Sequence, residues 1–234
     1  MEKRSLQDIQ AFMLDMDGVV YAGTQLLPGA REFIAHLQKT RTPYLFLTNN
    51  SSRTPAQYRE RLARMGIETT EEQIFTSALA TASWLARHAP AGARVLVIGE
   101  RGIQEALQER GFQLVDDHEE ADYVVVGFDS QFHYAKAREA AFAIQRGVPF
   151  IATNTDASLP TEVGNAPGAG SIVAMLEVAT GVKAHVIGKP EPGIFEQALE
   201  RLGTSPEETA MIGDRYETDI VGGHRAGLLT IGVL

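Results

Sequence analysis

Short apolar runs alternate with amphipathic segments along nearly the whole chain. The runs are rich in β-branched residues and have the length of buried strands: AFML, PYLFL, RVLVIG, YVVVGF, VPFIA, HVIG, TAMIG and LLTIGVL. The segments between them carry apolar residues at helical spacing. This alternation predicts an α/β protein with a largely parallel sheet.

The expected helices have readable start and stop signals. TPAQYRERLARMG has Thr54 as N-cap, Pro55 at the first helical position and Gly66 as terminator. Further helices are expected from Pro192 to Gly203 and from Ser171 to Gly181. Two more segments, SALATASWLARHAP and YAKAREAAFAIQRG, end at a proline and at a glycine.

Periodicity alone leaves the domain organisation open. After the helix that ends at Pro90, a new series of strands and helices begins at ARVLVIGERG. The chain then reaches another strand, loop and helix at AHVIGKPEPG. Either all the expected strands form one sheet, or the chain forms two α/β lobes with the second inserted in the first.

The composition is that of an ordinary globular protein. The 234 residues are 44% hydrophobic and 22% charged. A formal net charge of -9 argues against a nucleic-acid partner. The absence of cysteine excludes disulfides, thiolate zinc sites and cysteine nucleophiles. No run approaches the roughly 20 apolar residues of a membrane helix, and no signal peptide is visible. We therefore expect a cytoplasmic protein with no membrane partner.

Several expected strands end in residues capable of chemistry. AFML is followed by Asp15, Met16, Asp17 and Gly18, YLFL by Thr48, Asn49 and Asn50, and AMIG by Asp214. Sites in open parallel sheets form beyond the carboxyl ends of the strands, so these ends should meet if the strands are neighbours. HVIG similarly leads to Lys189, and Asp219 follows Asp214 by about one helical turn.

These residue types suit a metal ion and a phosphate. A few carboxylates, completed by waters and a phosphate, are typical ligands of Mg²⁺, and Lys189 suits a phosphoryl oxygen. The two-residue period of a strand would place Asp15 and Asp17 on the same side. Gly18 permits a tight turn and close approach of a ligand. Each residue alone is more typical of a cap, a turn or the surface, but their joint order predicts a site.

The segments LDMDGVVY, LFLTNNSSR, IGKPEPGIF and MIGDRYETDI resemble the four ordered motifs of the haloacid dehalogenase superfamily of phosphohydrolases. VVVGFD, ATNTDASLPTEVG and PGAGSIVAMLE resemble its NagD-type branch, which includes p-nitrophenyl phosphatases and phosphoglycolate phosphatases. The resemblance covers nearly the whole chain. It implies a Rossmann-like, three-layer α/β/α core with a parallel sheet at residues 1–79 and 184–234, and an inserted α/β cap at residues 80–183.

The resemblance also implies a mechanism. Asp15 would attack phosphorus and form an aspartyl phosphate. Asp17 would protonate the leaving oxygen and then deprotonate the water that hydrolyses the acyl phosphate. The implied activity is a Mg²⁺-dependent phosphatase for small phosphomonoesters: sugar phosphates, nucleoside monophosphates, phosphoglycolate or p-nitrophenyl phosphate.

The binding residues follow from the same motifs. The phosphoryl group would be bound by Thr48, Asn49, Asn50 and Lys189. Mg²⁺ would be bound by Asp15, the backbone carbonyl of Asp17 and Asp214. Asp219 would act behind these ligands or through water. In the cap, the expected substrate-selecting residues are Asp129, Asn154 and Asp156.

Two alternatives from other classes remain at this point. One is a non-catalytic phospho-ligand-binding or regulatory protein on the same fold, against which Asp17 argues because a binder needs no acid/base group. The other is a phosphotransferase, in which an acceptor hydroxyl replaces water. Members of the branch that the chain resembles often form dimers through the cap, which makes a homodimer an expectation here. Family members usually continue with a further helix and strand after the segment that matches LLTIGVL; at Leu234 either the given sequence is shortened or the protein lacks that edge strand.

Overall fold

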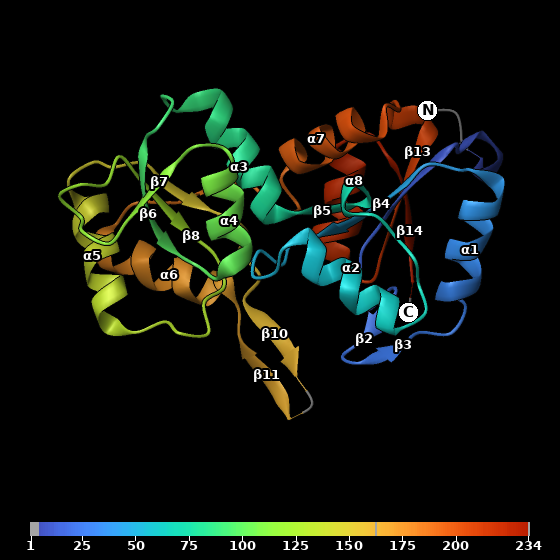
Figure 1. Cartoon of the computed structure of the whole chain (residues 1–234), viewed down its shortest axis with the longest axis horizontal. Helices are drawn as coiled ribbons and strands as arrows, with labels where there is room; N and C mark the ends of the chain where they lie inside the picture. Colours follow the sequence, from blue (N-terminus) through green and yellow to red (C-terminus); the bar gives the residue numbers. More distant parts are fainter. Residues whose placement is uncertain (1–4, 162, 234) are drawn as a thin grey trace. The chain divides into compact units, whose positions relative to one another are not determined.

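The computed structural model describes residues 5–161 and 163–233 and divides into two compact units (Figure 1). The first unit consists of Met1–Thr48, Pro55–Phe75 and Lys189–Leu234. The second unit consists of Asn49–Thr54 and Thr76–Gly188. A short piece of chain directly after Thr48 therefore belongs to the second unit.

The first unit is built on a five-stranded sheet with the order β14-β13-β1-β4-β5. Its strands are β1 (Ala11–Leu14), β4 (Tyr44–Thr48), β5 (Ile74–Thr76), β13 (Thr209–Gly213) and β14 (Leu229–Gly232). The central strand β1 pairs in parallel with β13 on one side and β4 on the other, and β14 pairs in parallel with β13. A small antiparallel hairpin of β2 (Tyr21–Ala22) and β3 (Gln25–Leu26) follows β1.

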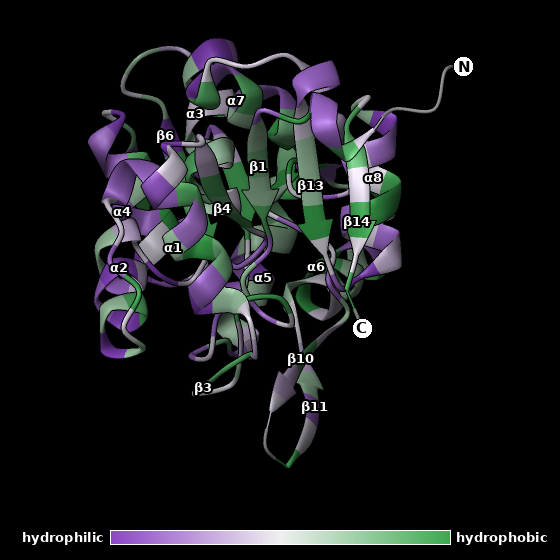
Figure 2. Ribbon diagram, turned by 90° about the vertical axis from the view of Figure 1, so that its right-hand side faces the viewer, coloured by the Kyte–Doolittle hydropathy of each residue, from purple (hydrophilic) through white to green (hydrophobic). Residues whose placement is uncertain are grey.

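Helices cover both faces of this sheet. α1 (Ala30–Thr40) and α2 (Pro55–Arg64) contribute Leu37 and Tyr58 to a buried cluster that contains Ile212 of β13. Met211 faces the opposite way because side chains alternate along a strand. A Cβ placed on Gly223 would lie 3.2 Å from Met211, so α8 (Val221–Arg225) covers this second face together with α7 (Pro192–Leu202). The unit thus has three layers, and its strands are white to green between helices that carry purple segments (Figure 2).

Short helical turns complete the first unit. They are η1 (Leu6–Asp8), η2 (Glu71–Gln73), η3 (Pro206–Glu208) and the π-helical turn η4 (Tyr216–Ile220). The turn η4 lies between β13 and α8 and carries Asp219. Among the described residues, no helix has the length and apolar character needed to cross a membrane.

The second unit has its own five-stranded sheet, in the order β12-β9-β8-β6-β7, with parallel pairs throughout. Its strands are β6 (Arg94–Ile98), β7 (Gln113–Val115), β8 (Tyr123–Val126), β9 (Phe150–Ala152) and β12 (His185–Val186). Its helices are α3 (Ser77–His88), α4 (Arg101–Glu109), α5 (Tyr134–Gln145) and α6 (Ala169–Thr180). An antiparallel hairpin of β10 (Ser158–Thr161) and β11 (Gly164–Pro167) precedes α6.

The expected α/β organisation in two lobes is confirmed, and the single-sheet alternative is wrong. Each apolar run chosen from the sequence contains a strand, whereas the short strands outside these runs were not expected: β2, β3, β5, β7, β10 and β11. α6 begins at Ala169, two residues before the expected Ser171. The boundaries 79/80 and 183/184 stay a prediction. Since β12 pairs with β9 of the second sheet, we propose that the second boundary lies at 188/189.

Candidate active site

The polar strand ends of the first unit lie side by side. Asp15 directly follows β1, Thr48 is the last residue of β4, and Asp214 directly follows β13. Because β1 is hydrogen-bonded to both other strands, these positions are neighbours at one edge of the sheet, as expected from the sequence. Asp15 and Thr48 are buried.

The expectation that strand alternation orients Asp15 and Asp17 is wrong. β1 ends at Leu14, so neither carboxylate belongs to the strand. The chain turns at Gly18, whose φ of +88° lies in the region that favours glycine. In this turn Asp15 and Met16 are buried, whereas Asp17 is exposed.

Lys189 connects two of the carboxylates. Its ammonium group donates hydrogen bonds to Asp15 Oδ1 at 2.8 Å, to Asp219 Oδ1 at 2.6 Å and to the carbonyl oxygen of Leu47 at 3.1 Å. Only 2% of Lys189 is exposed, so these bonds form in a region with little competing water. Burial alone would lower the pKa of Lys189, but Asp15 and Asp219 outweigh it and raise the pKa above its ordinary value.

Asp219 is fixed from both sides. Its Oδ1 accepts the bond from Lys189, and its Oδ2 accepts one from the backbone N–H of Arg215 at 3.1 Å. A Cβ on Gly213 would overlap the Asp219 side chain, so the chain needs glycine there. With both oxygens engaged in this way, Asp219 is suited to orienting Lys189.

The carboxylates outnumber the cation that neutralises them. Burial raises the pKa of Asp15 from 3.8 to about 7; Lys189 opposes this shift, and the nearby Asp219 and Asp214 add to it. The pKa of Asp214 is also raised, first by desolvation of its carboxyl group and then by Asp219. The site therefore carries an excess of negative charge that a further cation would relieve.

The donor set fits a magnesium ion. Asp15, Asp214 and Asp219 each offer a carboxylate oxygen, and these oxygens lie within 4.8 Å of one another. Carboxylates without nitrogen or sulfur ligands are typical of Mg²⁺ sites. A Cβ on Gly18 would overlap the carboxyl group of Asp214, so Gly18 is the residue that leaves this carboxyl its room.

Asp17 contacts Tyr21, which lies outside the set of site residues predicted from the sequence. The hydroxyl of Tyr21 donates to Asp17 Oδ2 at 3.4 Å, and the guanidinium of Arg61 lies over the Tyr21 ring, 4.1 Å from its centre. Burial and the neighbouring Asp17 raise the pKa of Tyr21, so the phenol keeps its proton. The signal available in the sequence was an aromatic residue four positions after Asp17, beyond Gly18. In the structure the turn closes through a hydrogen bond from the Gly18 N–H to the Tyr21 carbonyl.

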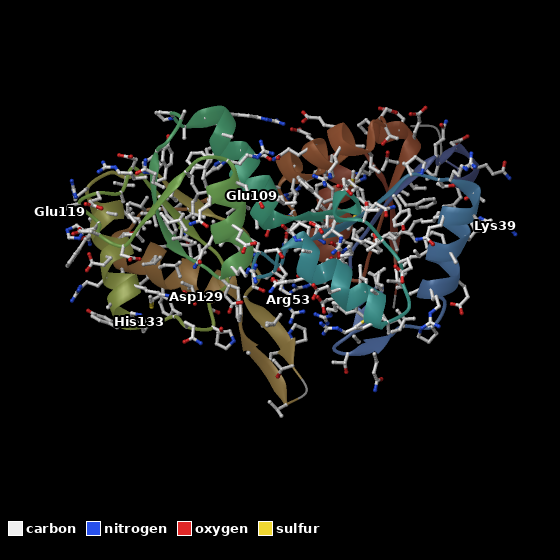
Figure 3. The ribbon with its side chains drawn as sticks, viewed as in Figure 1. Lys39, Arg53, Glu109, Glu119, Asp129 and His133 are labelled. Atoms are coloured by element: carbon white, nitrogen blue, oxygen red, sulfur yellow. The ribbon has the colours of Figure 1, made fainter. Side chains whose placement is uncertain are left out.

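The remaining predicted residues belong to the second unit. Asn49 and Asn50 follow Thr48 in the chain; the carbonyl of Asn49 accepts a hydrogen bond from Asn154, and the side-chain oxygen of Asn50 accepts one from Ser52. Asp129 lies beyond the carboxyl end of β8 (Figure 3), and its Oδ2 accepts a hydrogen bond from Lys136 Nζ at 2.6 Å. Asn154 and Asp156 contact Asn49.

Family comparisons agree with the motifs. A model described as haloacid dehalogenase-like hydrolase matches residues 12–113, and a second, described as HAD-hydrolase-like, matches residues 186–234. An acid sugar phosphatase of Staphylococcus aureus (strain USA300) is 43% identical over 228 residues, which are 97% of this chain and 87% of the relative.

Solved structures show the same fold. NagD from Escherichia coli K-12 has a TM-score of 0.90 and 34% identity, covering 97% of this chain and 88% of that one. A glycerol phosphate phosphatase from Mycobacterium tuberculosis, in complex with magnesium, has a TM-score of 0.91 and 36% identity, covering 97% of this chain and 68% of that one.

Proposed function

The chain belongs to the haloacid dehalogenase-like hydrolases, in their NagD and p-nitrophenyl phosphatase branch, and we propose that it cleaves small phosphomonoesters through an aspartyl phosphate on Asp15. It is a phosphatase of the HAD type. The observation that carries the mechanism is the contact of buried Lys189 with Asp15, which directly follows β1, and with Asp219 of η4.

Asp15 is the proposed nucleophile. Its Oδ1 is held by Lys189, which fixes the direction of the carboxylate and leaves Oδ2 to approach phosphorus. The same lysine reduces the repulsion between the carboxylate and an incoming phosphate dianion. A carboxylate attached to a rigid strand end loses little orientational freedom on reaction.

Asp17 is the proposed general acid and base. It is exposed, unlike Asp15, and so has access to a leaving group and to water. The bond from Tyr21 orients its carboxyl group. In the first step Asp17 protonates the leaving oxygen, and in the second it removes a proton from the water that attacks the acyl phosphate.

Magnesium is the proposed cofactor. The residues that would hold it are Asp15, Asp214 and the backbone carbonyl of Asp17, with Asp219 behind them. Once bound, the ion would supply positive charge to the phosphoryl oxygens. The support is the acidic cluster of this chain and the magnesium in the mycobacterial relative.

The phosphoryl group has proposed contacts on both sides of Asp15. Thr48 ends the neighbouring strand β4 and offers its hydroxyl. Lys189 supplies positive charge, and the backbone N–H groups of Asn49 and Asn50 supply donors next to Thr48. The side-chain oxygen of Asn50 accepts bonds from Ser52, and the contribution proposed for Asn50 is that of its backbone N–H.

We propose sugar phosphates and other small polyol phosphates as the substrate class. The support is the acid sugar phosphatase and the glycerol phosphate phosphatase among the relatives. A cytoplasmic location and a dimer formed through the second unit also remain proposals. Exposed Met175 and Val178 on α6 are apolar surface that a second copy would cover, and light scattering on the purified protein tests for the dimer.

The test uses the purified full chain with Mg²⁺. Release of free phosphate from a panel of phosphorylated sugars, polyols and nucleosides should be abolished by EDTA and restored by Mg²⁺. Beryllium fluoride, which mimics an acyl phosphate on a carboxylate, should inhibit the protein competitively. Absence of phosphate release, or transfer of phosphate only to an added hydroxyl acceptor, would overturn hydrolysis as the activity.

A further inference from the structure

The backbone carbonyl of Asn49 is held by two side chains of the second unit. Its oxygen accepts a hydrogen bond from Ser77 Oγ at 2.5 Å and one from Asn154 Nδ2 at 2.7 Å. Ser77 and Asn154 are both buried, and water therefore competes little for these bonds. Two donors on one oxygen fix the orientation of the peptide plane between Asn49 and Asn50.

The side chain of Asn49 is held by the same turn. Its Nδ2 donates to the two carboxylate oxygens of Asp156 at 3.4 Å and 3.3 Å. The backbone N–H of Asp156 in turn donates to Asn154 Oδ1 at 3.0 Å. Asn154 and Asp156 are therefore linked to each other, and each binds a different part of Asn49.

Glycine is needed beside this contact. A Cβ on Gly188 would lie 2.6 Å from Asn49 Oδ1, far inside ordinary contact distance. The N–H of Gly188 donates to the carbonyl of Thr153 at 3.0 Å. The residue before Lys189 and the residue after Thr48 are thus both attached to the segment Thr153–Asp156.

The rest of the segment that follows Thr48 is anchored in the same way. The hydroxyl of Thr153 donates to Ser51 Oγ at 3.0 Å. The N–H of Gly102, near the start of α4, donates to the carbonyl of Ser52 at 2.9 Å. Residues 49–54 are therefore held at several points by the second unit.

Because the carbonyl of Asn49 has a fixed orientation, the N–H of Asn50 in the same peptide group also has one. The peptide bond is planar and trans, so the N–H of Asn50 points opposite to the carbonyl of Asn49. Bonds to that carbonyl from Ser77 and Asn154 therefore determine where the Asn50 N–H is aimed. Backbone N–H groups bind phosphoryl oxygens well only when they are already oriented before binding.

Building on the proposed function, we propose that Asn154 and Asp156 are positioning residues for phosphate binding. They hold Asn49 so that the N–H groups beside Thr48 are oriented toward the phosphoryl group. This role differs from the substrate selection expected from the sequence, because it acts on the phosphate that all substrates share and not on their organic part.

The test measures phosphate itself. Titration calorimetry gives the Kd of inorganic phosphate with Mg²⁺ for the full chain and for three variants. Asn154→Leu keeps the size but removes the donor, and Asp156→Ala removes the acceptor. We expect Kd to rise about fivefold to tenfold in each, as for one lost hydrogen bond. Asp156→Asn keeps one acceptor oxygen and should restore most of the affinity.

The variants are also assayed with two substrates of unlike organic part, p-nitrophenyl phosphate and glycerol phosphate. We expect kcat/KM to fall by the same factor for both. An unchanged phosphate Kd with unequal losses for the two substrates would overturn positioning in favour of substrate selection. An unchanged Kd with only a lower Tm would show a merely structural role.

The control is Asp122→Ala. Asp122 also lies in the second unit and accepts bonds from the backbone N–H and the side chain of Arg94, but it does not bind Asn49. Its replacement should leave the phosphate Kd unchanged. Asp156 is only half-buried, so its replacement should disturb the packing less than replacement of the buried Asn154. If Asn154→Leu fails to fold, Asp156→Ala still tests the proposal. Wild-type protein that binds phosphate but does not hydrolyse esters would overturn the proposed function and not the positioning.

Discussion

The ammonium group of Lys189 lies 2.8 Å from the carboxylate of Asp15, and both side chains are almost entirely shielded from solvent. A buried ion pair contributes little to stability by itself, because desolvation of its charges offsets their attraction. The role of this ion pair is to orient the carboxylate: Lys189 binds Oδ1 of Asp15 and leaves Oδ2 available to react.

Replacement of Asp15 should abolish turnover. In Asp15→Asn the amide occupies the same volume but is a poor nucleophile. We expect kcat for p-nitrophenyl phosphate with Mg²⁺ to fall at least about a thousandfold, with circular dichroism unchanged. A variant with near-normal kcat would show that another group attacks phosphorus.

Replacement of Lys189 should destabilise the protein. Lys189→Met leaves Asp15 and Asp219 buried without their cation, which costs about 3–5 kcal/mol in comparable pairs. Urea unfolding at pH 8 measures the loss. The loss should shrink at pH 5.5, where Asp15 can take up a proton, and in the double variant that also carries Asp15→Asn. Equal losses at both pH values and in both backgrounds would contradict the assigned pairing.

Magnesium should stabilise the protein more at high pH. In the absence of metal, the pKa of Asp15 is raised from 3.8 to about 7, so the folded state binds this proton more tightly than the unfolded state. That contribution to stability is complete below about pH 4 and is lost as the pH rises through about 7. We expect Tm in EDTA to fall from pH 5.5 to pH 8, and the Tm gain on adding Mg²⁺ to be larger at pH 8.

Asp15→Asn is the control for this pH dependence. It removes the titrating carboxyl, so the Tm of the variant in EDTA should change less between pH 5.5 and pH 8. A Mg²⁺-dependent gain in wild-type Tm of the same size at both pH values would exclude Asp15 as a ligand whose protonation competes with the metal.

Loss of the Tyr21 hydroxyl should affect poor leaving groups most. Tyr21→Phe removes the bond to Asp17, and glycerol phosphate needs Asp17 to protonate its leaving alkoxide. We expect kcat to fall about tenfold for glycerol phosphate and little for p-nitrophenyl phosphate, whose leaving group departs without a proton.

Tyr44→Phe is the matched control. The Tyr44 hydroxyl accepts a bond from Gln38 in the same unit, and the ring is buried on β4. This variant should leave both substrates unaffected. If Tyr21→Phe slowed both substrates equally, the tyrosine would have a structural role and no link to proton transfer.

Many of the proposed catalytic residues could be predicted, because they stand at strand ends that the local sequence pattern reveals. Asp15, Thr48 and Asp214 each stand at the end of an apolar run, and parallel strands bring such ends together. The order of the motifs then supplied their roles. The two-residue period of a strand does not apply to Asp17, because β1 stops at Leu14 and the sequence does not show this end.

Long-range hydrogen bonds could not be predicted in this way. Asn49 and Asn154 are 105 positions apart, and nothing in either local sequence specifies the other as its partner. The segment NNSSRT reads as a loop, so its attachment to α3, α4 and the turn at Asn154 became visible only in three dimensions. The sequence indicates Asn154 and Asp156 as candidate site residues, but it predicts that they contact the substrate.

Because residues 49–54 belong to the second unit, that unit is not a single continuous insertion in the chain. A chimera that exchanged only residues 76–188 with a relative would leave a foreign partner for Asn49, Ser51 and Ser52. A graft that carries residues 49–54 together with 76–188 would keep those contacts matched. The transferable piece of this protein is therefore discontinuous in sequence: the hexapeptide after Thr48 belongs with a lobe from which a helix and a strand separate it along the chain.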